Sequence, residues 1–220
     1  MKYKCLVFDH DDTVVNSTAT IHHPCFQEYL KLRYPGMSCS LEEYFLKNFD
    51  PGFIPMCKDQ YGMDDGALSD ETDFWRAYVK EHVPQAYPGV REIMERHKAQ
   101  GGLLCVVSHS MDFNIRRDFA ANSLPEPDAV YGWERPPQER KPYPFPLTDI
   151  MERFRLSPED MLMIDDLKPG FDMAKSCAVA FAGAGWANDI PAIEGFMRAN
   201  CGHYFKTVRE LKDFLFMSPV

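Results

Sequence analysis

The hydrophobic positions of this chain form short apolar runs that are separated by longer segments with a helical pattern. The runs with the length and apolar content of buried strands lie at 3–8, 103–107, 128–131, 161–164 and 178–182. Helix-like segments lie between the later runs. Strands that are buried on both faces are typical of parallel sheets covered by helices, so the alternation predicts an α/β fold with a doubly wound, Rossmann-like parallel sheet.

A long insertion interrupts this alternation between residues 16 and 87. It holds helical patterns near 17–33, 41–48 and 69–82, and it contains no convincing strand pattern. The sequence Tyr87-Pro88-Gly89-Val90 marks the return to the sheet, because proline and glycine there open a helix that runs to about Ala99. We therefore expect an inserted α-helical cap domain at 17–87 and an α/β core at 1–16 and 88–220.

Composition narrows the classes of function. The chain has 220 residues, 45% of them hydrophobic, and a formal net charge of -9. A nucleic-acid binder needs a basic surface, so this charge argues against nucleic acid as a partner. The apolar runs are too short to cross a bilayer, so we expect no membrane association. Seven cysteines without CxxC spacing indicate a reduced, cytoplasmic protein, which we expect to be a monomer or a homodimer.

Two acidic residues follow the first predicted strand. Asp9 and Asp11 come directly after the apolar run that ends at Phe8. Alternate side chains of an extended segment share a face, and open α/β sheets bind ligands at the carboxyl ends of their strands. This pattern is typical of phosphoryl transfer, with Asp9 as the candidate nucleophile and Asp11 as its acid and base partner.

Three further polar groups follow later strand patterns. Ser108 ends the second run and either binds a phosphate oxygen or caps a helix. Lys141 lies in the proline-rich segment KPYPFP, which favours a fixed cation over a solvated surface lysine. Asp165 and Asp166 follow the fourth run. Mg²⁺ prefers hard oxygen ligands, so Asp9, one of this pair and a backbone carbonyl of the first loop would suffice to hold it.

Taken in order, these motifs resemble those of the haloacid dehalogenase superfamily, in which Mg²⁺-dependent phosphatases predominate. The matching segments are DHDDT at 9–13, Ser108, Lys141 in KPYPFP, and Asp165-Asp166. The resemblance spans essentially the whole chain. It implies a phosphomonoester hydrolase with Mg²⁺ as cofactor and a small phosphorylated metabolite as substrate.

The resemblance also implies a role for each motif residue. Asp9 attacks phosphorus to form an aspartyl-phosphate, and Asp11 protonates the leaving oxygen and then activates water. Thr13 and Ser108 orient the phosphate, and Lys141 neutralises it.

The implied metal ligands are Asp9, the backbone carbonyl of Asp11, and Asp166, with Asp165 beside it. His109 follows Ser108 and is a further candidate for contact with the phosphate or the leaving group.

Other positions depart from the family pattern or leave a role open. Asp12 stands where the family often has glycine, and Gly170 stands where many relatives carry a second acid of the fourth motif. Asp172, two residues further on, is an open candidate for that acid. By strand alternation His10 faces away from the two acids beside it. The adjacent pair His22-His23 has an open role, with substrate contact as one alternative.

Several activities share this fold, so the site residues must decide among them. Halide leaves without a proton, and the acid at Asp11 therefore argues against dehalogenation. A phosphonatase would need a lysine reaching in from the insertion, and surface charge explains the lysines there better. A phosphomutase and a phospholigand-binding protein without turnover remain as alternatives. The intact set of acids and Lys141 favours hydrolysis.

Overall fold

The computed structural model describes residues 2–217. The chain divides into two compact units, one formed by residues 2–16 and 85–217 and the other by residues 17–84. Within the described residues, no helix combines the length and apolar character that crossing a membrane requires. We call the first unit the α/β unit and the second the helical unit.

The α/β unit contains a parallel sheet whose strands follow the order β3-β2-β1-β4-β5-β6 in the described residues. The strands are β1 (Cys5–Phe8), β2 (Leu103–Val107), β3 (Ala129–Tyr131), β4 (Met161–Asp165), β5 (Ala180–Ala184) and β6 (His203–Phe205). The predicted doubly wound sheet is confirmed. Because β1 lies between β2 and β4, the strand order reverses beside it, and ligands bind at such a switch point in open α/β sheets.

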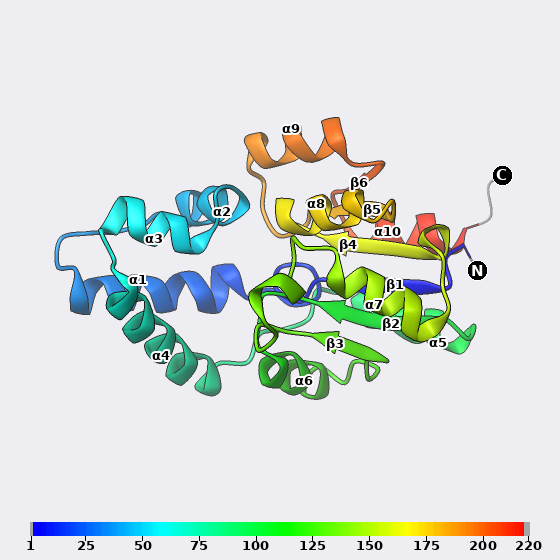
Figure 1. The fold of residues 1–220 in the computed structure, drawn as a ribbon, viewed down its shortest axis with the longest axis horizontal. Helices are drawn as coiled ribbons and strands as arrows, with labels where there is room; N and C mark the ends of the chain where they lie inside the picture. The colour runs from blue at the N-terminus through cyan, green and yellow to red at the C-terminus, as the bar shows by residue number, and fades with distance from the viewer. Residues whose placement is uncertain (1, 218–220) are drawn as a thin grey trace. The chain divides into compact units, whose positions relative to one another are not determined.

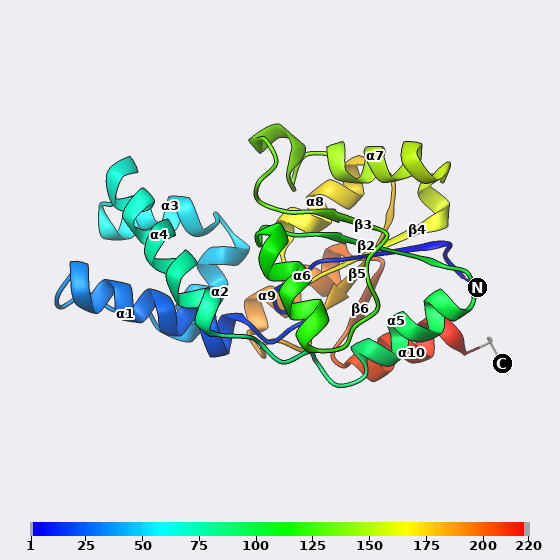
Figure 2. The same cartoon turned by 90° about the horizontal axis from the view of Figure 1, so that it is seen from below.

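Helices cover both faces of this sheet (Figures 1 and 2). Figure 2 shows α5, α6 and α10 on one side and α7 and α8 on the other. The helices of the unit are α5 (Val90–Ala99), α6 (Asp112–Ala121), α7 (Phe145–Phe154), α8 (Lys168–Ser176), α9 (Pro191–Asn200) and α10 (Val208–Phe216), with short 3-10 turns at Pro137–Glu139 and Pro158–Asp160.

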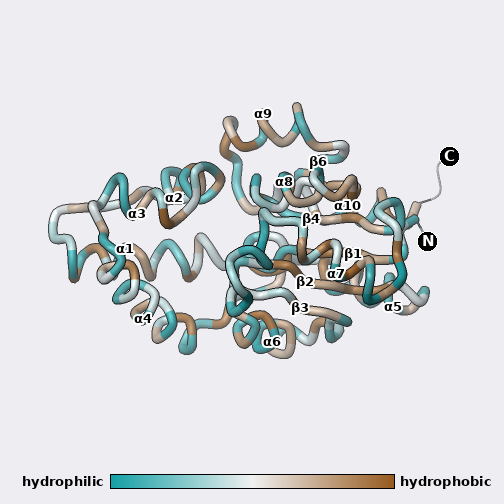
Figure 3. The backbone as a smooth tube through the Cα atoms, viewed as in Figure 1, coloured by the Kyte–Doolittle hydropathy of each residue, from teal (hydrophilic) through white to brown (hydrophobic). Residues whose placement is uncertain are grey.

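The core of the α/β unit follows from strand alternation. All four residues of β1 are fully buried, and the apolar colour of the central strands is visible in Figure 3. Leu6 and Phe8 belong to a cluster that includes Ile93 of α5, Ile115 of α6 and Leu211 of α10. Since successive side chains of a strand point to opposite faces, the even-numbered residues of β1 pack toward α5, α6 and α10. The odd-numbered residues point the other way.

The helical unit consists of a π-helical turn and four α-helices. They are η1 (Thr18–His22), α1 (His23–Arg33), α2 (Leu41–Phe49), α3 (Phe53–Tyr61) and α4 (Asp65–Glu81). The patterns near 17–33 and 41–48 correspond to η1 with α1 and to α2. Helix α4 begins earlier than the predicted 69 because the side chain of Asp64 accepts a hydrogen bond from Ala67 N at 2.8 Å and caps it. Helix α3 was not predicted.

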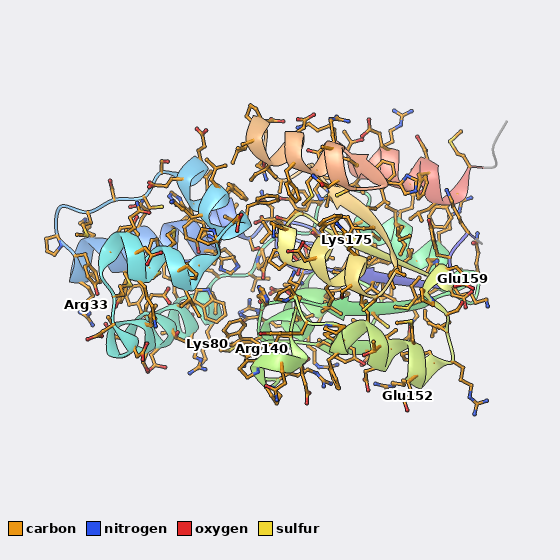
Figure 4. All side chains as sticks on the ribbon, turned by 45° about the horizontal axis from the view of Figure 1, so that its top comes forward. Arg33, Lys80, Arg140, Glu152, Glu159 and Lys175 are labelled. Atoms are coloured by element: carbon orange, nitrogen blue, oxygen red, sulfur yellow. The ribbon has the colours of Figure 1, made fainter. Side chains whose placement is uncertain are left out.

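Aromatic side chains form the centre of the helical unit. The ring of Phe26 lies 5.6, 5.3 and 5.4 Å from the rings of Tyr44, Phe53 and Tyr61. Such tilted and edge-to-face contacts stabilise an aromatic core beyond the area that they bury. Charged side chains lie on the outer surfaces of both units, as Figure 4 shows for Arg33 of the helical unit and Glu152 of the α/β unit.

Residues 85–87, which the sequence pattern places in the insertion, pair with the α/β unit. Asn16 N donates to Gln85 O at 2.9 Å, and Tyr87 N donates to Val14 O at 2.9 Å. Val15 and Ala86 form an antiparallel bridge between these two bonds. The chain therefore leaves and re-enters the α/β unit through a short paired segment, which no apolar run in the sequence indicates.

A buried carboxyl group in the helical unit gives a prediction about pH. Burial raises the pKa of Glu71, which is 6% exposed, to about 7, and nearby His22 opposes the shift. The folded state therefore keeps this proton after the unfolded chain has lost it, so stability falls as pH rises from about 4.5 to about 7, by up to about 3 kcal/mol. Glu71→Gln is expected to raise Tm more at about pH 8 than at about pH 5.

The matched control for this prediction is Glu81→Gln, at the exposed end of the same helix. Thermal unfolding of both variants should show the pH-dependent gain for Glu71→Gln alone. Equal Tm changes of Glu71→Gln at the two pH values would contradict the account.

Candidate active site

Four loops at the carboxyl ends of the strands bring the predicted residues together. Asp9 follows β1, Ser108 follows β2, Lys141 lies between β3 and β4, and Asp165 ends β4. The register pairs Phe8 with Ile164, and Asp9 N donates to Ile164 O at 2.8 Å, so Asp9 and Asp165 are neighbours across the sheet. These residues are buried at the edge of the sheet where its strand order reverses.

Lys141 lies at the centre of the site. Its Nζ is 2.8 Å from Asp9 Oδ1 and 2.8 Å from Asp165 Oδ2, and all three side chains are buried. Burial alone would lower the pKa of Lys141, but the two carboxylates raise it above its ordinary value. A lysine in this position is charged and paired. Lys141 is thus a fixed, buried cation and not a solvated surface lysine.

The two adjacent aspartates differ in their contacts. Asp165 accepts hydrogen bonds on both oxygens, from Leu167 N to Oδ1 at 2.8 Å and from Lys141 Nζ to Oδ2 at 2.8 Å. Asp166 Oδ1 accepts a hydrogen bond from Thr13 Oγ1 at 3.2 Å. Protein donors therefore occupy both carboxylate oxygens of Asp165, whereas Asp166 is held by Thr13 of the first loop.

The site carries an excess of negative charge. Carboxylate oxygens of Asp9, Asp165 and Asp166 lie within 4.8 Å of one another, and all three residues are buried. Burial, together with repulsion from Asp9, raises the pKa of Asp165 to about 7. Burial and repulsion from Asp12 raise the pKa of Asp166 well above its ordinary value. Three buried acids around one lysine form a set of hard oxygen ligands that fits a divalent cation such as Mg²⁺.

Asp11 lies in the turn after β1 and is half-buried. Its backbone pairs with Val15, and its carboxylate is not one of the three acids that cluster in the described structure. The next residue, Asp12, is buried and has a positive φ of 58°. Glycine favours that conformation, and aspartate tolerates it better than most residues do. The turn therefore adopts at Asp12 the conformation that glycine favours, and it adds a buried carboxyl group.

Ser108 and His109 occupy the loop after β2. Ser108 is buried, and its Oγ accepts a hydrogen bond from Ser110 N at 3.1 Å, which leaves the hydroxyl hydrogen to donate. His109 Nε2 lies 2.7 Å from the backbone oxygen of Lys141. Since a carbonyl oxygen only accepts, this contact places the ring hydrogen on Nε2. His109 thus links the loop of Ser108 to that of Lys141.

The surroundings of His109 keep it neutral. Desolvation by the surrounding protein atoms and the nearby charge of Lys141 lower the pKa of His109 to about 4. A neutral imidazole cannot attract a phosphate by charge. Its unprotonated Nδ1 can accept a hydrogen bond from a hydroxyl group, so the ring suits a leaving group better than a phosphate oxygen.

The glycine at position 170 has a steric explanation. A Cβ on Gly170 would lie 2.0 Å from Asp165 Oδ2, the oxygen that Lys141 contacts. No second acid can stand there without moving Asp165. Asp172 does not join the three-acid cluster in the described residues; its Oδ2 lies 2.7 Å from Lys168 Nζ on the same helix.

Gly170→Ala is therefore expected to lower the free energy of unfolding by about 1–3 kcal/mol and to displace Asp165. Gly195→Ala in α9 is the matched control, because its added Cβ would meet nothing within 4 Å and alanine favours a helix over glycine by about 0.5–1 kcal/mol. Thermal unfolding of both variants checks this. A native-like Tm for Gly170→Ala would contradict the crowding.

Two contacts of the site were not predicted from the sequence. Trp186, two residues beyond the carboxyl end of β5, donates from Nε1 to Thr13 O at 3.2 Å and so holds the first loop. His10 Nε2 lies 3.0 Å from Asp118 Oδ2 in α6. Strand alternation indicated only that His10 faces away from its acidic neighbours. The sequence signal that could have indicated a buried partner at Asp118 is an acidic residue on the apolar face of an amphipathic helix.

The sequence of this chain is similar to those of known proteins. The family model described as haloacid dehalogenase-like hydrolase matches residues 6–184. A phosphoglycolate phosphatase of Haemophilus influenzae is 25% identical over 206 residues, which cover 88% of this chain and 91% of that protein. A phosphoglycolate phosphatase of Nitrosospira multiformis is 39% identical over 83 residues, which cover 37% of this chain and 36% of that protein.

Solved structures share the fold. A haloacid dehalogenase-like protein from Agrobacterium tumefaciens superposes with a TM-score of 0.77 at 15% identity, covering 97% of each chain. A hydrolase from Deinococcus radiodurans with bound phosphate and sodium superposes with a TM-score of 0.71 at 19% identity, covering 97% of this chain and 95% of that one. At these identities the superpositions establish the fold alone.

Proposed function

This chain is a phosphatase that belongs to the haloacid dehalogenase-like hydrolases, and we propose that it hydrolyses a small phosphorylated metabolite with Mg²⁺ through an aspartyl-phosphate on Asp9. One observation carries the proposal. The buried carboxylates of Asp9, Asp165 and Asp166 cluster beside a buried lysine, Lys141. This arrangement suits a nucleophile and a divalent cation side by side.

In the first step a carboxylate oxygen of Asp9 forms a bond to phosphorus, and the bond from phosphorus to the leaving oxygen breaks. Asp11 gives its proton to that oxygen. In the second step Asp11 takes a proton from water, the water oxygen attacks phosphorus, and the bond to Asp9 breaks. The products are the alcohol and inorganic phosphate, and both aspartates return to their starting states.

Lys141 and Ser108 stabilise charge during both steps. Lys141 Nζ contacts Asp9 directly, so it orients the nucleophile and faces the oxygens that gain charge as phosphorus is attacked. Ser108 has a free hydroxyl hydrogen for a phosphate oxygen. Thr13 acts less directly, because its hydroxyl donates to Asp166.

We assign the metal to Asp9, Asp166 and the backbone carbonyl of Asp11. Asp165 is committed to Leu167 N and to Lys141, so its role is to position the lysine. When bound, Mg²⁺ offsets the negative charge of the acids and of the phosphate. The same excess of charge gives a readout without turnover, since Mg²⁺ should raise Tm of the native protein.

The substrate class rests on the relatives and on the site. Two relatives are named phosphoglycolate phosphatase, which makes phosphoglycolate the first substrate to test. The seven free cysteines support action in the reducing cytoplasm.

Phosphate release from para-nitrophenyl phosphate and from phosphoglycolate, measured with Mg²⁺ and with a chelator, tests the proposal. Release that requires Mg²⁺ is expected, and Asp172→Asn, a surface acid on α8, should leave it unchanged. Release that is equal with the chelator would overturn the metal assignment. No release from either substrate or from a panel of sugar and nucleotide phosphates would favour a mutase or a binding protein.

A further inference from the structure

We propose that His10 and Asp118 form a positioning pair that holds the catalytic loop of Asp9 and Asp11 in register with the loop of Ser108. The inference rests on the proposed function for its effect on turnover. Neither residue touches the reacting atoms in that mechanism. Both are charged or polar groups in the core, and the chemistry assigned above uses neither of them.

The contact between the two side chains is direct and buried. His10 Nε2 lies 3.0 Å from Asp118 Oδ2, and the side chains are 0% and 3% exposed. Because a carboxylate only accepts, Nε2 carries the hydrogen in this bond. The other oxygen of Asp118 accepts from Arg117, with Nε at 2.8 Å and Nη2 at 2.7 Å. Arg117 therefore balances the charge of Asp118, and Asp118 keeps one oxygen for His10.

Strand geometry explains why His10 reaches α6. Phe8, the last residue of β1, packs in one cluster with Ile115 of α6, and His10, two residues further along the chain, lies on the same side because alternate residues of an extended segment share a face. The ring of His10 stacks on Phe119 of that helix, with centroids 6.0 Å apart and planes at 26°. A polar group at this depth requires a hydrogen-bond partner, so the position of His10 is tied to that of Asp118.

The backbone of His10 organises the turn that holds Asp11. His10 O accepts hydrogen bonds from Val14 N at 2.9 Å and from Val15 N at 3.1 Å, and Asp12 N donates to Val15 O at 2.8 Å. The turn is thus closed on His10. Any movement of His10 along the strand direction would move Asp11 with it.

Helix α6 holds this turn at a second point. Asn122, which directly follows α6, accepts a hydrogen bond on Oδ1 from Ala86 N at 2.8 Å. Ala86 in turn pairs with Val15. Helix α6 also begins four residues after Ser108. It therefore connects His10 and Val15, at the two ends of the first loop, to the loop of Ser108. Positioning of this kind matters because a misplacement of about 1 Å can cost about 100-fold in rate.

Two similar substitutions at His10 separate positioning from general polarity. A glutamine amide can reach the place of Nε2 and donate to Asp118, whereas an asparagine amide reaches only the place of Nδ1. We expect His10→Asn to lower kcat for para-nitrophenyl phosphate by about 10- to 100-fold with KM within about twofold of native. His10→Gln should retain most of the native kcat.

The assays are run at a temperature where circular dichroism shows each variant fully folded. Arg116→Gln, which breaks an exposed ion pair on the same helix, is the control and should behave as native. An unchanged kcat for His10→Asn would overturn the proposal. Equal losses for His10→Asn and His10→Gln would also overturn it, because a purely structural role does not depend on the reach of the amide.

Amide hydrogen exchange gives a readout that does not need turnover. The amides of Asp12, Val14 and Val15 should exchange faster in His10→Asn than in native protein and in His10→Gln. Native exchange in His10→Asn would refute the anchoring of the loop. If the native protein hydrolyses no phosphomonoester, the proposed function fails, and the exchange rates still decide whether His10 and Asp118 position the loop.

Discussion

Asp9→Asn is expected to reduce kcat for para-nitrophenyl phosphate by about 10⁴-fold or more and to leave the fold intact. An amide oxygen lacks the negative charge of the carboxylate and is a poor nucleophile toward phosphorus. The fold should persist because Lys141 retains Asp165 at 2.8 Å. Removing one of three crowded acids also relieves the repulsion that raises the pKa of Asp165.

The measurement is steady-state kinetics at saturating Mg²⁺, with Tm recorded for the same preparations. Asp172→Asn is the matched control, since it makes the same chemical change at an ion pair with Lys168 on the surface of α8. The control should keep native kcat. If Asp9→Asn kept more than about a tenth of native kcat, Asp9 would not be the nucleophile.

Lys141→Met is expected to lower both activity and stability. Methionine preserves much of the volume but leaves the carboxylates of Asp9 and Asp165 buried without their cation. Removing one partner of a buried ion pair costs about 3–5 kcal/mol, and removing a group that stabilises transition-state charge costs about 10²- to 10³-fold in kcat. Chemical denaturation and steady-state kinetics measure the two effects.

A cation supplied from solution separates the two roles of Lys141. Mg²⁺ should recover part of the lost stability of Lys141→Met, because it offsets the same carboxylates, but it should not restore kcat. Lys175→Met, at an exposed position of α8 marked in Figure 4, is the control and should change neither quantity. A native Tm for Lys141→Met without Mg²⁺ would contradict the pairing described here.

The sequence predicts most of the sheet because its central strands are buried on both faces and therefore appear as continuous apolar runs. Strand β6 lacks this signal: His203–Phe205 is three residues long and only half-buried. Helix α3 was missed because Pro51, Gly52 and Pro55 suggest a loop. In the structure Gly52 is the N-cap, and Pro55 lies in the first turn, where no amide hydrogen bond is lost.

The candidate site was predictable to the extent that it depends on strand ends. Parallel strands bring their carboxyl ends to one edge, so the proximity of Asp9 and Asp165 follows from the order of the motifs. The contact between His10 and Asp118 does not follow from the order of the motifs, because the two residues are 108 positions apart and no local pattern encodes such a contact. The glycine at 170 likewise has meaning only once the position of Asp165 Oδ2 is known.

The most direct test of the account is to trap the covalent intermediate in Asp11→Asn. Nitrophenolate leaves without a proton, so Asp9 can still be phosphorylated by para-nitrophenyl phosphate when Asp11 cannot activate water. Rapid mixing should show one equivalent of nitrophenolate per protein and then a stall, and mass spectrometry after acid quench should find one phosphoryl group on the peptide that contains Asp9. Steady release without a burst, and with no phosphoryl group on that peptide, would contradict the mechanism.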